Sequence, residues 1–159
     1  MINEVDYDQV GADAAGFVEI ANPTAAAADL TGLALVLING SDGTEYGRVA
    51  LTGTIAAGGY LRVDVDPQNG APDGLALYDT ASGSLLDSLS YEGPITTATI
   101  SGHTFDLVEG AVLPAVVADS NTVTGSLIRS PDMSDTNNAA VDWVFTTTPT
   151  PGAANVLTP

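Results

Sequence analysis

The sequence predicts an all-β fold, a sandwich or a barrel of short antiparallel strands, from three observations. Apolar residues recur in short runs with period-two alternation, as in Tyr60–Val65, where every second residue is Leu or Val. Turn residues, among them 17 Gly and 9 Pro, separate these runs. The chain has 159 residues, of which 45% are apolar, so it can fill one hydrophobic core. We therefore expect one domain.

Two strands are expected near the N-terminus. Ile2–Tyr7 and Phe17–Ala21 flank a glycine-containing loop, which favours an antiparallel hairpin. Asn22 and Pro23 should end the second strand, because proline has no N–H to donate to a sheet. The four alanines at Ala25–Ala28 are too few to nucleate a helix, so we predict a loop with at most one helical turn.

The rest of the chain continues with short apolar runs between turn signals. Seven further strands are predicted at Leu33–Asn39, Glu45–Leu51, Tyr60–Val65, Leu75–Tyr78, Leu85–Tyr91, Gly125–Arg129 and Trp143–Thr147. Between Glu92 and Thr124 the pattern weakens, and only Thr97–Ile100 and Leu113–Val117 are strand candidates. We interpret this segment as a long excursion over one end of the fold.

The predicted core consists of the inward-facing apolar residues of these strands. Its members are Val18, Ile20, Leu35, Leu37, Leu61, Val63, Leu77, Leu127, Trp143 and Phe145. A binding role for Trp143 is the alternative, but its alternation with Phe145 favours the core. Residues 148–159 are rich in Thr and Pro, so we place the domain at residues 1–155 and the start of a linker or C-terminal tail at 156–159.

The charge is strongly acidic. Twenty acidic residues against three arginines and no lysine give a net charge of -17. Such a chain repels phosphate backbones, so we expect no direct binding to nucleic acid. Two interpretations of the acidity remain open: a solvated coat suited to a saline habitat, which we favour, and binding of divalent cations through carboxylate oxygens.

Membrane insertion and cysteine chemistry are not expected. No stretch approaches the roughly 18 consecutive apolar residues that a membrane helix needs. Asn3, Glu4 and Asp6 stand where a signal peptide would be basic or apolar, so Met1 begins either a cytoplasmic protein or, as we favour, a piece of a longer precursor. The chain has no cysteine, which excludes disulfides and leaves the compartment open.

Three acidic loops are candidate calcium sites, since calcium takes six to eight oxygen ligands. The first loop is the preferred one, with the candidate metal ligands Asp6, Asp8, Asp13 and Glu19. The others contain Asp64, Asp66, Asn69 and Asp73, and Asp132, Asp135, Asn137, Asn138 and Asp142. Calcium is the possible cofactor, but the favoured expectation is no cofactor and solvated loops.

Two glutamates in the first hairpin require compensation. Glu4 and Glu19 lie within the two paired strands, and like charges in near-facing positions are destabilising. Arg129 is the candidate partner, in a buried or half-buried ion pair with one of them; a bound cation is the alternative.

No catalytic constellation is evident. His103 is the only histidine, and a triad drawn with Ser101 and Asp106 lacks the nucleophile elbow of a serine hydrolase. Zinc would need more nitrogen or sulfur ligands than the chain offers, and no phosphate-binding or dinucleotide-binding motif is present. We therefore predict that the chain is not an enzyme.

The order of several sequence blocks resembles the lamin-tail domain family. The blocks are INEV, FVEIANP, DLTGLALVL, NGAPDGLALYD, SGSLLDSLSYEG, GSLIRS and DWVFTTTPTPGAAN, and they cover nearly the whole chain apart from Glu92–Thr124. They are most similar to the bacterial branch attached to secreted endonucleases and other extracellular hydrolases. The resemblance implies an immunoglobulin-like antiparallel β-sandwich.

The resemblance also implies a function. We expect a non-catalytic accessory or interaction module of a larger secreted or cell-surface protein, a nuclease or a related hydrolase. Its partner would be a protein or a cell surface, with a catalytic domain in the same full-length chain, and its location extracellular or at the cell surface. The alternative is a calcium-dependent structural or adhesive module of the cell surface.

Overall fold

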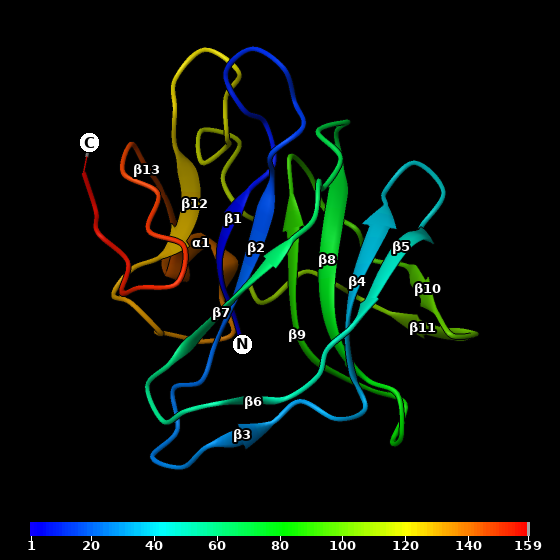
Figure 1. The fold of residues 1–159 in the computed structure, drawn as a ribbon. Helices are drawn as coiled ribbons and strands as arrows, with labels where there is room; N and C mark the ends of the chain where they lie inside the picture. The colour runs from blue at the N-terminus through cyan, green and yellow to red at the C-terminus, as the bar shows by residue number, and fades with distance from the viewer. Residues whose placement is uncertain (159) are drawn as a thin grey trace.

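Two sheets pack face to face in the computed structural model, which describes residues 1–158 (Figure 1). The five-stranded sheet has the order β13 (Trp143–Thr146), β12 (Ser126–Arg129), β1 (Ile2–Asp6), β2 (Phe17–Ala21) and β7 (Tyr60–Asp64). The six-stranded sheet has the order β11 (His103–Phe105), β10 (Ala98–Ile100), β5 (Thr44–Ala50), β4 (Leu33–Asn39), β8 (Asp73–Asp79) and β9 (Ser84–Tyr91). Neighbouring strands are antiparallel except for β10 and β5.

The predicted all-β, immunoglobulin-like antiparallel sandwich is confirmed. Each of the nine predicted principal strands is present, with bounds shifted by no more than two residues. The described residues contain one short helix, α1 (Ala139–Asp142), which was not predicted from the sequence. No helix in residues 1–158 has the length and apolar character needed to cross a membrane.

The Asn-Pro stop after β2 works through the asparagine side chain. Asn22 Nδ2 donates hydrogen bonds to the carbonyl oxygens of Ala26, Ile55 and Ala56, at 2.7, 3.0 and 3.0 Å. These bonds hold a small two-stranded sheet, β3 (Ala28–Asp29) and β6 (Thr54–Ile55), across the open end of the sandwich (Figure 1). The alanine run forms no helical turn and enters β3 at Ala28.

Strand β4 is buried on both faces, which explains its continuous apolar run. On its inner face, Leu35 and Leu37 join the main core between the sheets. The other predicted core residues, on other strands, belong to the same core, and of the predicted set only Leu61 and Phe145 are partly exposed. On its outer face Ala34, Val36 and Ile38 belong to a second apolar cluster.

Residues 95–107 of the weakly patterned segment 92–124 cover this second cluster. Ile95, Ala98, Ile100 and Leu107 are buried against the outer face of the six-stranded sheet, where β10 and β11 extend it beyond β5. The predicted strand at Thr97–Ile100 is therefore present as β10. The prediction at Leu113–Val117 was wrong: this stretch forms no strand, and Leu113 packs against the main core from a loop.

Leu35→Ala is expected to lower the free energy of unfolding by about 2–5 kcal/mol, the cost of a leucine-sized cavity in a close-packed core. Leu35 is 0% exposed and lies between the two sheets. Urea unfolding measures the loss, and Leu86→Ala, at a position that is 51% exposed, is the matched control. A loss of only a few tenths for Leu35→Ala would place the residue outside the packed core.

The outer face of the five-stranded sheet is covered by the C-terminal segment rather than by apolar residues. Thr158 contacts Thr146 of β13 through its backbone N–H, at 3.1 Å from the Thr146 Oγ1 atom. Thr150, Gly152 and Asn155 bond to side chains of β1, β2 and the loop after β12. The segment expected to run into a linker is thus bonded to the sheet as far as Thr158; Pro159 lies outside the described residues.

Candidate functional site

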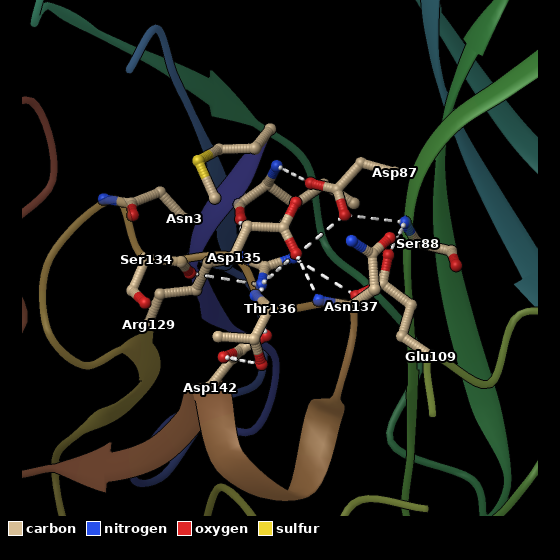
Figure 2. A network of polar contacts seen from close by, with 12 residues as sticks. Asn3, Asp87, Ser88, Glu109, Arg129, Ser134, Asp135, Thr136, Asn137 and Asp142 are labelled. Carbon is tan, nitrogen blue, oxygen red and sulfur yellow. Dashed lines mark hydrogen bonds and ion pairs between the residues drawn. The ribbon is translucent and has the colours of Figure 1, made fainter. Parts of the chain in front are cut away.

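Arg129, at the end of β12, is fully buried at the centre of a polar network (Figure 2). Its Nη2 atom donates to Asp87 Oδ1 on β9 at 2.9 Å and to Glu109 Oε2 at 3.4 Å. Its Nη1 atom donates to Asp142 Oδ2 at 3.2 Å and to Asp135 Oδ1 at 3.3 Å. One guanidinium group, on a strand of the five-stranded sheet, therefore joins four carboxylates, one from β9 of the opposite sheet, one from α1 and two from loops.

The remaining contacts of the guanidinium fix its orientation. Its Nε atom donates to the carbonyl oxygen of Ile2 on β1 at 2.8 Å. The guanidinium carbon lies 5.0 Å from the centroid of the Trp143 ring, within range of a cation–π contact. Arg129 therefore uses all its nitrogen atoms, which a lysine, with a single ammonium group, could not do.

The predicted pairing of Arg129 with Glu4 or Glu19 was wrong. Both glutamates point to the outer face of the five-stranded sheet, and they face each other in the β1–β2 register. Arg129 points instead toward β9 and the segment 134–142, as Figure 2 shows. Asp87 and Glu109 had no direct sequence signal as partners, apart from the position of Asp87 among the leucines of β9.

The pKa values of two carboxyl groups beside Arg129 are shifted in opposite directions. Burial, followed by the neighbouring Asp87 carboxylate, raises the pKa of Glu109 to about 8. Burial also acts to raise the pKa of Asp142, but hydrogen bonds from Thr136 and Asn138 and the charge of Arg129 hold it below its ordinary value. Asp142 therefore stays ionised and pairs with Arg129, whereas Glu109 retains a proton near neutral pH.

Glu4 and Glu19 accept hydrogen bonds from several donors, none of which belongs to Arg129. Glu4 accepts bonds from Ser126 Oγ at 2.6 Å and from the Thr150 N–H at 2.9 Å. Glu19 accepts bonds from Asn3 Nδ2 at 2.9 Å and from the Gly152 N–H at 2.6 Å. Burial outweighs these bonds and raises the pKa of Glu19 to about 7. The pair fastens the C-terminal segment to the sheet.

Asp119 holds a second segment, the loop that follows β1. Its Oδ2 atom accepts bonds from the backbone N–H groups of Tyr7 and Asp8, at 2.9 and 3.2 Å. Burial raises the pKa of Asp119 to about 7. The bonds join the loop 7–16 to the segment before β12, and these two run side by side in Figure 1. Asp119 had no sequence signal.

The predicted calcium ligands do not form one cluster. Asp8 and Asp13 lie together, because Asn69 Nδ2 donates to both carboxylates, at 3.1 and 3.2 Å. Asp6 accepts a bond from Gln9 Nε2 at 2.7 Å, and Glu19 lies in the separate site under the C-terminal segment. Within residues 1–158, no three His, Cys, Asp or Glu side chains are arranged so that they could hold a metal ion.

A polar cleft of about 590 Å³ opens where the loop 65–72, the loop 7–16 and the β4–β5 turn meet. Its polar lining includes the carboxylates and amides of Asp13, Asp66, Asp73, Asn39, Gln68 and Asn69. The loop is held in place by two tyrosines: Tyr91 Oη donates to the Gln68 carbonyl at 2.6 Å, and the Gln68 N–H donates to Tyr46 Oη at 2.7 Å. The cleft is therefore a preformed acidic site.

Ser101, His103 and Asp106 each have separate surroundings in the described part of the chain. His103 is exposed on β11, and its ring lies 6.4 Å from that of Phe105. Ser101 accepts a bond from Arg48 at 2.9 Å, and the Asp106 carboxylate accepts one from the Val108 N–H. These three side chains are thus not joined to one another by any hydrogen bond in the structure.

Comparisons of the chain with protein-family models, with curated proteins and with solved structures return no match. The resemblance to lamin-tail domains stays a prediction from the sequence blocks.

Proposed function

We propose that this chain is a non-catalytic interaction module of the lamin-tail type, carried by a larger secreted or cell-surface protein such as a nuclease or a related hydrolase. One observation supports this most: its buried carboxylates accept hydrogen bonds from segments that they hold in place. Glu4 and Glu19 hold the C-terminal segment, Asp119 holds the loop 7–16, and Asp142 holds the segment 134–142.

Raised carboxyl pKa values are also what a general acid or base requires, so catalysis is the rival to weigh. A catalytic carboxyl must reach a substrate. Glu19 is 0% exposed and Asp119 is 6% exposed, each beneath a segment that it binds. The side chain of Glu109 is 12% exposed, but its carboxylate is bonded to Arg129 and to the Ser88 N–H. A structural role, in which these buried carboxyl groups hold neighbouring segments in place, explains their burial better than a catalytic role does.

The proposal predicts separable activities in the full-length protein. Deletion of this domain should abolish retention at the cell surface or binding to the partner. It should leave the specific activity of an attached catalytic domain within about twofold, since the proposed module contributes no catalytic residue. Cell fractionation followed by an assay of the soluble enzyme measures both. Equal loss of turnover and retention would contradict the proposal.

The isolated chain provides the complementary test. It should not hydrolyse DNA, RNA or phosphate esters. Turnover that survives repurification and disappears in His103→Ala would contradict the proposal. The calcium-dependent adhesive alternative would be favoured by a calcium-specific rise in melting temperature at fixed ionic strength, lost in Asp8→Asn and Asp13→Asn but kept in Asp66→Asn.

A further inference from the structure

A buried carboxylate oxygen in the wall of the acidic cleft has no hydrogen-bond donor. Asp73, the first residue of β8, is 1% exposed. Its Oδ2 atom accepts a bond from the Gly70 N–H at 2.8 Å, while its Oδ1 atom makes no hydrogen bond among the described residues. The nearby Gly40 N–H donates to the carbonyl oxygen of Pro72, at 3.1 Å. An acceptor buried without a partner is costly, so Oδ1 favours a ligand that donates to it.

The rest of the cleft determines the charge of such a ligand. Asp13 and Asp66 are exposed in its lining, and no lysine or arginine lines it. Burial and the charge of Asp13 raise the pKa of Asp66. Burial also raises the pKa of Asp73, outweighing the opposite effect of the nearby Gly40 and Gly70 N–H groups, as expected of a carboxylate that has no cation beside it. Anionic ligands are therefore repelled, and a cationic ligand would relieve the repulsion between the carboxylates.

The spacing of these carboxylates favours an organic cation over a metal ion. A metal ion needs several oxygens converging on one point, and the described acidic side chains include no such group of three. A guanidinium group instead offers five N–H donors in a plane, which can reach carboxylates that lie apart. The cleft volume of about 590 Å³ is within the range of small-ligand sites.

We propose that this cleft binds an arginine side chain of a basic segment in a partner protein, with the guanidinium group donating to Asp73 Oδ1 and to the exposed carboxylates of Asp13 and Asp66. The inference rests on the proposed function as an interaction module and names the chemistry of the partner. None of the three arginines of the chain lines the cleft, so a ligand would supply the complementary charge. The cleft is preformed, because Tyr46 and Tyr91 already hold its loop.

The probe is the peptide acetyl-Gly-Arg-Gly-amide, titrated into the whole chain and followed by amide chemical shifts. The matched ligand is the same peptide with citrulline, which has the shape of arginine without its charge. Shifts should concentrate on Gly40 and on residues 68–73. The citrulline peptide should bind about tenfold more weakly, as expected from the loss of a charge-assisted hydrogen bond.

Variants separate the cleft from general attraction by the acidic chain. Asp73→Asn should weaken binding of the arginine peptide about tenfold, and Asp66→Asn, at an exposed position, serves if Asp73→Asn does not fold. Asp29→Asn removes the same charge from the exposed strand β3, outside the cleft, and should change the affinity by less than about twofold. Equal effects of Asp29→Asn and of the cleft variants would overturn the proposal.

Two further outcomes would also overturn it. One is peptide binding that is absent or maps elsewhere; the other is calcium, at matched ionic strength, shifting the cleft amides when the peptide does not. These failures differ from failure of the proposed function. If the chain still retains its protein at the cell surface without binding the peptide, it remains an interaction module with another binding site. Hydrolytic turnover by the chain would instead refute the proposed non-catalytic function and leave the peptide result unchanged.

Discussion

Arg129→Met should lower the free energy of unfolding by about 3–5 kcal/mol, the usual cost of removing one partner from a buried ion pair. The methionine fills much of the space of the arginine stem but leaves the carboxylates of Asp87 and Asp142 buried without a cation; their side chains are 2% and 1% exposed. The bond to the carbonyl oxygen of Ile2 is lost as well. Urea unfolding at pH 7 measures the change.

Arg62→Met is the control for this substitution. Arg62 forms an ion pair with Asp64 at 2.6 Å, but the two side chains are 42% and 81% exposed. Exposed pairs contribute little, so the loss should stay below about 1 kcal/mol. Similar losses for Arg129→Met and Arg62→Met would show that the buried network contributes no more than a surface pair, contrary to its geometry.

Acidification from pH 8 to pH 5 should stabilise the domain by at least about 2 kcal/mol, at about 1.4 kcal/mol for each unit of pKa difference. In the folded state the pKa of Glu19 is about 7 and that of Glu109 is about 8, both above the ordinary glutamate value of 4.5. The pKa of Asp119 is about 7, above the ordinary aspartate value of 3.8. Over this pH range the folded state therefore binds more protons than the unfolded state. The stabilisation is complete below the ordinary pKa values and is lost as the pH rises through 7 and 8.

The trend should reverse in stronger acid. The pKa of Asp142 is held below its ordinary value of 3.8, so its contribution is present above that pH and is lost as the pH falls further. Stability should therefore be greatest between about pH 4 and pH 5. Thermal unfolding across pH 3–9 at constant ionic strength measures the profile.

Conservative variants identify the groups responsible for this profile. Asp119→Asn and Glu19→Gln should each flatten the slope between pH 5 and pH 8, because neither amide binds a proton in this range. Asp29→Asn is the control: hydrogen bonds from Thr31 lower the pKa of Asp29, so it titrates below the range. A wild-type profile that rises toward pH 8 would contradict the assignment of buried, proton-binding carboxyls.

The strands could be predicted from the sequence because burial of a strand follows its local pattern. Leu61 and Val63 alternate with polar residues, and β7 is found where that alternation predicts it. The cover formed by residues 92–124 could not be predicted in the same way. Its short strands depend on apolar side chains such as Ile95 and Leu107 meeting a distant sheet face.

The polar network was harder to predict because its partners are distant in sequence. Arg129 was expected to pair with Glu4 or Glu19, which lie on β1 and β2 of the same sheet but on the face toward the C-terminal segment. Its actual partner Asp87 comes from the opposite sheet, 42 residues away. Which carboxylate meets which cation depends on how the sheets are stacked, and no local pattern carries that information.

A double-mutant cycle between Arg129 and Asp142 tests most directly whether the buried carboxylates brace this domain. Urea unfolding of the wild type, Arg129→Met, Asp142→Asn and the double variant provides the coupling energy. If Asp142 fastens the segment 134–142 through Arg129, the losses should be non-additive by more than about 1 kcal/mol, with the double variant more stable than the sum predicts. Losses that add to within about 0.5 kcal/mol would contradict the bracing role.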